Sequence, residues 1–308
     1  MQKPFRFGIV SGGVKSRASL FAKVRRAEEL GYATWSMADH VSGSSSSVPI
    51  LAMAAAVTTS LRIGSCVFCH AFRHPVMLAH EVATLDQLSE GRFELGLGPG
   101  YVATDYHQVG LPFEDAGARV DRFEEAVRLI KYCLTQPQGS FSGTYYPATS
   151  LDNRPLPLQQ PHPPLYIGGG GKRMLQFAAH EADIVGIGPK HDSHGMRMSE
   201  MTLESTAQKV AWVREAAGER FDHLELNCAL LYVRITDQPP GESLAEPSVA
   251  SRWGVQIPPR SIYAAIGSVK EIVEELQARR EKYGISYIQV TEPYMEAFAP
   301  VVARLTGY

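Results

Sequence analysis

The sequence has little that would point to a nucleic acid or a membrane as its partner. Its 30 Lys and Arg residues stand against 32 Asp and Glu residues, so the formal net charge is only -2 over 308 residues. Without a basic excess, the overall field does not attract nucleic acid or anionic lipid. The chain also lacks an apolar run near the ~20 residues that cross a bilayer and lacks the apolar region of a signal peptide. We therefore expect a cytoplasmic protein with no nucleic acid or membrane partner.

Cysteine is scarce, because four residues in a chain of this length do not make a disulfide framework. Cys66, Cys69 and His70 match the haem-attachment pattern C-x-x-C-H. They lie in an apolar run typical of a strand, however, where residues three apart point to opposite faces. Cys133 and Cys228 are isolated and supply no second zinc pair. We expect neither haem nor a bound metal.

What the chain does have is a regular alternation of strand-like and helix-like segments. The expected strands are 5–11, 34–40, 63–69, 92–97, 165–168, 183–187, 224–235 and 286–290. The expected helices are 19–31, 49–59, 76–88, 118–134, 174–182, 205–217, 269–283 and 298–305. About eight strand–helix pairs with apolar strands predict an α/β fold, the (β/α)8 TIM barrel, as a single domain over 1–308. An open doubly wound sheet is the alternative.

Two segments interrupt this alternation. Residues 141–146 predict a small hairpin, and residues 236–267, rich in Pro, Gly and Ser, predict a long inserted loop before the last helix–strand unit. In a barrel, chemistry is found where the strands end and lead into the next helix. The residues expected at that rim are Ser11, Asp39, His40, Cys69, His70, Gly98 to Gly100, Gly168 to Gly171, Gly188 to Lys190 and Glu292.

Four glycines, Gly168, Gly169, Gly170 and Gly171, follow an expected strand and open an expected helix. Glycine allows a ligand to come close to the backbone, and free N–H groups at a helix start attract anions. A cation at a helix start works against the helix dipole, so we expect a phosphate to hold Lys172 or Arg173 there. The segment therefore predicts a phosphate site, although a flexible turn would also be rich in glycine.

The glycines of Gly96-Leu97-Gly98-Pro99-Gly100 invite comparison with a dinucleotide-binding fingerprint. G-x-G-x-x-G would need glycine at position 101, which is Tyr101, and no helix is expected directly afterwards. We interpret Gly98 and Gly100 instead as a strand-end loop that lets the backbone approach a planar ligand.

Asp39 and His40 close a predicted strand. Histidine can move a proton near neutral pH, and a neighbouring carboxylate can orient it. The alternative is that Asp39 caps the next loop and His40 is merely solvated. The serine-rich segment 42–47 that follows is typical of a lid or of disorder. Arg73 is expected to pair with a carboxylate, with an anion as the alternative partner.

Several strings in order resemble the bacterial-luciferase-like monooxygenase superfamily, and more closely its branch that uses the deazaflavin coenzyme F420. The matching segments are 27–32, 38–40, 72–75, 83–86, 91–98, 119–125 and 164–171. The resemblance extends over nearly the whole chain and is densest between residues 20 and 190.

The resemblance implies a single (β/α)8 barrel, commonly a homodimer, that holds a flavin or deazaflavin at the strand-end rim. It implies that Gly169, Gly170 and Gly171 bind the cofactor phosphate and that Asp39 and His40 face the redox ring, with His40 exchanging a proton. It also implies a non-proline cis peptide at Cys66-Val67 that supports the ring.

The substrate is expected to contact Tyr101 and Lys190. Members of the family that oxidise sugar phosphates carry glutamate where this chain has Tyr101, so the resemblance favours reduction of a small organic substrate. We expect an oxidoreductase that transfers hydride between coenzyme F420 and such a molecule. The alternatives are an FMN-dependent monooxygenase that uses oxygen and a non-catalytic flavin-binding protein.

Overall fold

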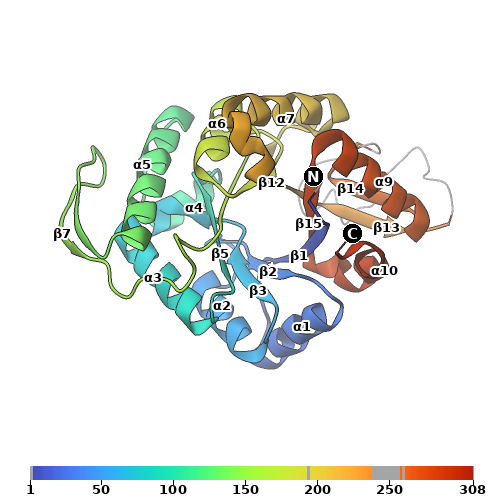
Figure 1. The fold of residues 1–308 in the computed structure, drawn as a ribbon, viewed down its shortest axis with the longest axis horizontal. Coiled ribbons are helices and arrows are strands. Elements are labelled where there is room, and N and C mark those ends of the chain that lie inside the picture. Colours follow the sequence, from blue (N-terminus) through green and yellow to red (C-terminus); the bar gives the residue numbers. More distant parts are fainter. Residues whose placement is uncertain (1–2, 193–194, 238–256, 259–260, 308) are drawn as a thin grey trace. The chain divides into compact units, whose positions relative to one another are not determined.

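The computed structural model describes residues 3–192, 195–237, 257–258 and 261–307. Strands and helices alternate along this part of the chain, as the sequence predicts (Figure 1). The chain divides into two compact units. Unit 1 comprises 1–10, 26–34 and 168–308, and unit 2 comprises 11–25 and 35–167. Each unit is described separately below, and a single domain over 1–308 stays a prediction.

Unit 2 is built on parallel strands covered by helices. β5 (Phe93–Gly98) pairs in parallel with β3 (Arg62–Ser65), β4 (Phe68–Cys69) and β8 (Leu165–Gly169). The helices of this unit are α2 (Ser47–Val57), α3 (Pro75–Leu88), α4 (Ala103–Gln108) and α5 (Ala116–Thr135). β8, β2 (Thr34–Met37) and α1 (Arg17–Glu29) have residues in both units.

The expected hairpin exists but is longer than 141–146. β6 (Gln138–Phe141) and β7 (Ala148–Asp152) pair antiparallel beside α5 (Figure 1). The Glu125 carboxylate on α5 accepts hydrogen bonds from the backbone N–H groups of Thr144, Tyr145 and Tyr146 at 2.6–2.8 Å. These bonds attach the turn of the hairpin to the helix.

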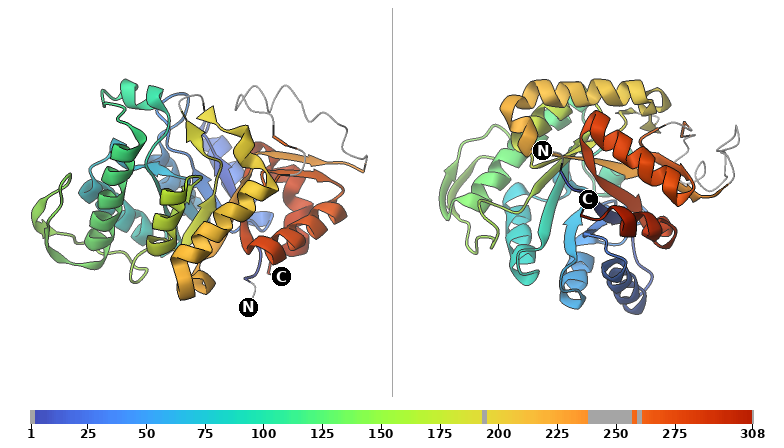
Figure 2. Two further views of the ribbon diagram at one scale, coloured as in Figure 1. Left: turned by 90° about the horizontal axis from the view of Figure 1, so that it is seen from above. Right: turned by 45° about the vertical axis from the view of Figure 1, so that its right-hand side comes forward.

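Unit 1 also contains parallel strands, in the order β1-β15-β12-β9. Their bounds are Arg6–Ser11 for β1, Ile184–Ile187 for β9, Glu225–Leu230 for β12 and Ile285–Thr291 for β15. The helices are α6 (Lys172–Glu181), α7 (Leu203–Ala217), α9 (Val269–Tyr283) and α10 (Met295–Leu305). α6 packs on α7, and α9 packs on α10 (Figure 2). β10 (His191–Asp192) and β11 (Gly195–Met196) form a short antiparallel pair.

The expectation of one long strand over 224–235 is wrong. The segment forms β12 and then β13 (Tyr232–Ile235), because the Leu231 N–H turns to the Tyr263 carbonyl and β13 pairs in parallel with β14 (Ala264–Gly267). β14 also corrects the expected loop over 236–267, whose last four residues are strand. Most of that expected loop, 238–256 and 259–260, lies outside the described residues.

Each unit has its own apolar core. In unit 1, Phe7 of β1 packs on Phe298 of α10, with ring centroids 5.9 Å apart. In unit 2, the rings of Phe68 and Phe93 stack at 6.5 Å, and Trp35 is fully buried. The strands are buried along most of their length, as parallel strands under helices should be.

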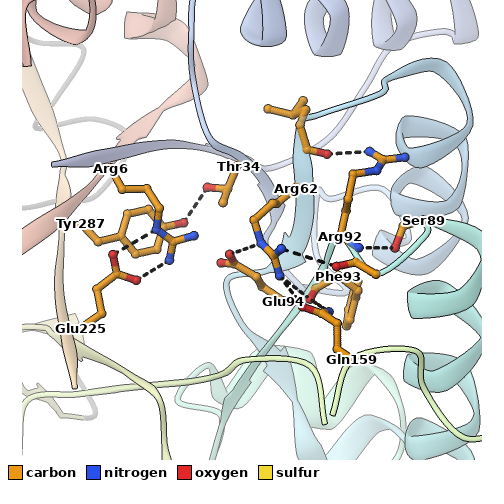
Figure 3. A network of polar contacts seen from close by, with 12 residues as sticks. Arg6, Thr34, Arg62, Ser89, Arg92, Phe93, Glu94, Gln159, Glu225 and Tyr287 are labelled. Atoms are coloured by element: carbon orange, nitrogen blue, oxygen red, sulfur yellow. Dashed lines mark hydrogen bonds and ion pairs between the residues drawn. The ribbon is translucent and has the colours of Figure 1, made fainter. Parts of the chain in front are cut away.

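Polar networks occupy the amino-terminal ends of the strands (Figure 3). In unit 1, the Arg6 guanidinium pairs with Glu225 and lies 3.9 Å from the Tyr287 ring centroid, and the Tyr287 hydroxyl bonds Thr34 at 2.6 Å. In unit 2, Arg62 donates to Glu94 at 2.6 Å. These are the strand ends at which polar residues typically serve stability.

Among the described residues, no helix is both long enough and apolar enough to cross a membrane.

Candidate active site

The strand ends of unit 2 place His40 against a buried carboxylate. His40 follows β2, and its Nδ1 lies 2.7 Å from Oδ2 of Asp105 on α4. The Asp105 side chain is 2% exposed, whereas that of His40 is 31% exposed. His40 Nε2 makes no hydrogen bond with any described residue. The arrangement therefore leaves one ring nitrogen of His40 able to exchange a proton with a ligand.

The carboxylate that holds His40 is thus Asp105 and not the adjacent Asp39. Asp39 accepts from Ser47 Oγ at 2.8 Å, from the Cys69 backbone N–H at 3.2 Å and from both terminal nitrogens of Arg73 at 2.7 and 3.2 Å. Each of its oxygens receives two of these bonds. Asp39 therefore ties the end of β2 to the end of β4, and the expected carboxylate partner of Arg73 is confirmed.

The serine-rich segment after His40 is anchored at three points. The Ser42 backbone N–H donates to Oδ1 of Asp105 at 3.0 Å, and Gln108 Nε2 donates to Ser42 Oγ at 2.6 Å. Ser45 Oγ lies 3.3 Å from the Val14 backbone N–H, which donates to it. Ser47 bonds Asp39, as described above. Hydrogen bonds therefore connect Ser42, Ser45 and Ser47 to neighbouring residues, and a role of the segment as a lid stays a prediction.

The peptide between Cys66 and Val67 is cis, as the resemblance implied. It interrupts the expected strand over 63–69, which forms β3 and β4 on either side of it. Val67 packs on β5, because a Cβ at Gly98 would lie only 2.7 Å from Val67 Cγ2. Gly98 is therefore required by the protein's own packing.

Gly100 and Tyr101 continue from β5 toward His40. Gly100 has φ of +75°, a left-handed conformation that favours glycine, and a Cβ there would collide with the Tyr106 hydroxyl and the Cys69 sulfur. The ring of Tyr101 meets that of His40 edge to face at a centroid distance of 6.0 Å. The structure therefore brings Tyr101 and His40 together. α4, which begins two residues later, is a helix that the sequence reading missed.

Burial keeps the neighbouring Cys69 and His70 uncharged at neutral pH. Burial raises the pKa of the Cys69 thiol to about 11 and lowers the pKa of His70 to about 4. Burial therefore disfavours the thiolate of Cys69, which is the form of cysteine that binds a metal. No group of three or more His, Cys, Asp or Glu residues in the described part of the chain could hold a metal ion.

The glycine-rich segment lies in unit 1. Gly168 and Gly169 end β8, and the Gly188 N–H donates to the Gly169 carbonyl at 2.9 Å. Two predicted site residues, Gly170 and Lys190, lie close together, since a Cβ at Gly170 would be only 2.4 Å from the Lys190 backbone nitrogen. A Cβ at Gly171 would meet nothing within 4 Å. Over residues 169–171, the open position is therefore Gly171.

The amino-terminal ends of α6 and α9, both in unit 1, differ in how their N–H groups are satisfied. α9 has a capping box, in which Ser268 and Glu271 bond each other's backbone N–H. α6 follows Gly171, has no side-chain cap and has no acidic residue in its first turn. Its first residue, Lys172, is exposed. The start of α6 is therefore suited to an anion, which supports the predicted phosphate site.

Asp105 and Gln108 are the residues that sequence reasoning missed. Both lie on α4, which is only six residues long and shows no apolar periodicity. Asp105 is 65 residues from His40, and no sequence motif links the two residues.

The family model described as luciferase-like monooxygenase matches residues 5–223. The chain belongs to this family. Its resemblance, noted on the strings around Asp39-His40, Gly96-Leu97-Gly98 and Gly168-Gly171, is confirmed.

Curated relatives of this luciferase-like protein use either cofactor. The F420-dependent glucose-6-phosphate dehydrogenase of Kineococcus radiotolerans is 32% identical over 56% of this chain and 54% of its own length. The FMNH2-dependent dimethylsulfone monooxygenase of Pseudomonas putida is 31% identical over 35% of this chain and 30% of its own length. The chain thus spans about half or less of the length of these relatives. The comparisons show a family with both F420-dependent and flavin-dependent oxidoreductases.

A solved structure shows the fold. The coenzyme F420-dependent tetrahydromethanopterin reductase of Methanopyrus kandleri matches with a TM-score of 0.76 at 19% identity and covers 99% of both chains. The fold class is the luciferase-like (β/α)8 barrel, and the open doubly wound sheet is excluded.

Proposed function

We propose that this luciferase-like protein transfers hydride between coenzyme F420 and a small organic substrate, with His40 exchanging the accompanying proton. The observation that carries the proposal is the His40 imidazole, which is held through Nδ1 by buried Asp105 and has Nε2 open. The similarity to an F420-dependent dehydrogenase over 188 residues supports it.

The residues present fit the cofactor's phosphate. Uncapped N–H groups, the open position at Gly171 and the exposed cation Lys172 gather at the start of α6. We assign the phosphate to Gly168, Gly169, Gly170 and Gly171. When bound, the coenzyme supplies hydride chemistry. We assign contacts with its ring to Asp39, Cys66 and Val67, as the resemblance implied, and to Gly98 and Gly100 of the strand-end loop.

The remaining residues bind and orient the substrate. Tyr101 lies against His40, and Val41 and Tyr101 keep about two-fifths of their surface exposed, at 40% and 41%. An apolar or conjugated substrate suits these surfaces, since no carboxylate stands at position 101. Lys190, exposed beside Gly170, is assigned to a polar group of the substrate. Homodimer formation and cellular location stay predictions.

An FMN-dependent monooxygenase is the second candidate. The 31% identity with an FMNH2-dependent monooxygenase favours it. A non-catalytic flavin-binding protein is the third candidate. It gives no role to the His40 imidazole, whose Nδ1 bonds Asp105 and whose Nε2 is open to a ligand.

The test is a titration of the purified protein with F420, FMN and FAD, followed by turnover measurements with each reduced cofactor. We expect F420 to bind most tightly and to be oxidised by a panel of small conjugated acceptors without oxygen consumption. Tight binding of FMN with oxygen consumption would establish the monooxygenase instead. Binding without turnover on any substrate would favour the non-catalytic reading.

A matched pair of variants tests the phosphate site. Lys172→Gln removes a cation at the uncapped α6, and Lys270→Gln removes one from the first turn of the capped α9. We expect Lys172→Gln to weaken F420 binding about 5–10-fold, which corresponds to ~1 kcal/mol for one charge–phosphate contact. Lys270→Gln should leave it unchanged. Equal effects of the two variants would contradict the assignment.

A further inference from the structure

The Asp105 carboxylate uses both of its oxygens on the segment that carries His40. Oδ2 lies 2.7 Å from His40 Nδ1, and Oδ1 accepts from the Ser42 backbone N–H at 3.0 Å. The side chain is 2% exposed, so water does not compete effectively for these bonds. Gln108, one turn later on α4, donates to Ser42 Oγ at 2.6 Å. Two side chains of α4, Asp105 and Gln108, therefore bond the segment 40–42.

This geometry restricts the protonation state of the imidazole. An ionised carboxylate accepts hydrogen bonds and donates none, and a neutral histidine carries its proton on one nitrogen only. With Asp105 ionised and His40 neutral, the 2.7 Å contact between Asp105 Oδ2 and His40 Nδ1 therefore places the proton on Nδ1. Nε2, which contacts no described hydrogen-bond partner, then carries the lone pair.

We propose that Asp105 is a positioning residue that fixes the Nδ1–H tautomer of His40 and so makes Nε2 the atom that exchanges a proton with the substrate. The assignment of the tautomer does not depend on which cofactor binds, whereas the role of Nε2 in catalysis rests on the proposed function. Because Asp105 also holds the Ser42 N–H, the orientation of the imidazole and the position of the serine-rich segment are coupled through one carboxylate.

The proton balance follows from the tautomer. In oxidation, the Nε2 lone pair of His40 would take the proton of a substrate hydroxyl as the hydride leaves its carbon, so that a carbonyl is formed. In reduction, the imidazolium would return the Nε2 proton to the carbonyl oxygen as a hydride is added to the carbon. A bound coenzyme would be the acceptor of the hydride in the first direction and its donor in the second. Nδ1 keeps its proton in both directions, and Asp105 faces the charge that develops on the ring.

The first experiment measures the tautomer in the full chain. Histidine labelled with 15N is observed at about pH 9, where an ordinary histidine is neutral, and the His40 signals are assigned by their loss in His40→Gln. We expect the proton on Nδ1. A proton on Nε2 in the native protein would overturn the proposal, and this measurement needs no cofactor.

The second experiment compares Asp105→Asn with Asp86→Asn. The Ser42 N–H and the Nδ1–H bond different oxygens of Asp105, and Asp105→Asn replaces one of these oxygens with an NH2 group, which donates and does not accept. Asp86 is equally buried but holds Gln159, far along the chain from His40. We expect Asp105→Asn to alter the His40 tautomer and to lower kcat about 100-fold with little change in KM. Asp86→Asn should leave the tautomer unchanged.

The outcomes separate the two proposals. An unaltered Nδ1–H signal together with unaltered kcat in Asp105→Asn would overturn the positioning role. If the tautomer behaves as expected but no turnover with F420 is found, the proposed function fails while the role of Asp105 stands. Asp105→Glu, which retains a carboxylate, should restore the Nδ1–H signal at least in part.

Discussion

Two polar clusters in unit 2 lie at opposite ends of parallel strands and differ in what they leave open. At the amino-terminal end of β3, Arg62 donates to Glu94 at 2.6 Å, to the Phe93 carbonyl at 3.2 Å and to Gln159 at 2.9 Å (Figure 3). After the carboxyl end of β2, His40 Nδ1 bonds Asp105, and His40 Nε2 has no hydrogen-bond partner among the described residues. The first cluster is closed upon itself and serves stability, whereas the second retains a reactive atom.

Loss of the open imidazole should have the largest effect. In His40→Gln, turnover should fall about 10²–10⁴-fold, the usual contribution of a positioned proton-transfer group. The unfolding midpoint should change little, because His40 is partly exposed. Steady-state kinetics and chemical denaturation check both expectations. His180→Gln, at an exposed position on α6, is the control, and full activity of His40→Gln would refute the role of His40.

Disruption of the cluster around Arg62 should lower stability and leave turnover unchanged, which is the reverse of the effect expected for His40→Gln. Glu94→Ala leaves the partly buried Arg62 without its carboxylate, and we expect the free energy of unfolding to fall by about 3 kcal/mol. Turnover of the folded fraction should be unchanged. Urea denaturation measures the loss, with Glu29→Ala in an exposed ion pair with Arg26 as the control. A comparable loss in both variants would mean that the cluster does not support the fold as we infer.

A second histidine at a carboxyl strand end sharpens the comparison. His70 follows β4, and its side chain is buried, with Nδ1 3.4 Å from the Gly98 carbonyl. Burial lowers the pKa of His70 to about 4, so between pH 6.5 and pH 4 the unfolded chain binds a proton that the folded chain does not. Stability is therefore complete above about pH 6.5 and falls by about 2–3 kcal/mol on acidification to pH 4.

Denaturation at pH 7 and pH 4.5 tests this expectation in the native protein and in His70→Phe. The difference in stability between the two pH values should be smaller in the variant, which has no ring nitrogen to protonate. His107→Gln, which removes an exposed histidine, should retain the full difference. An identical pH dependence in His70→Phe and the native protein would show that His70 titrates alike in the folded and unfolded chains.

Much of the fold could be predicted from the sequence. Apolar periodicity placed α9 at its observed bounds of Val269–Tyr283 and most other elements within about two residues. Periodicity depends on neighbours along the chain, so it could not show that the segment over 224–235 divides where Leu231 turns to a distant carbonyl. It also could not show α4, whose six residues are too few for a pattern.

The candidate site was predictable in its positions but not in its pairings. Asp39 and His40 are adjacent, and the sequence therefore suggested that one orients the other. Successive residues leaving a strand point in opposite directions, so Asp39 meets Arg73 while His40 meets Asp105. Which carboxylate reaches which nitrogen depends on contacts across 34 and 65 residues of chain.

The contact between Val67 and the bare α-carbon of Gly98 has a consequence for protein engineering. Any side chain introduced at position 98 needs the space that the valine methyl occupies, so alanine there should be accepted only alongside a smaller residue at 67. Libraries that vary position 98 alone should therefore yield glycine only, whereas joint randomisation of positions 67 and 98 should recover compensated pairs.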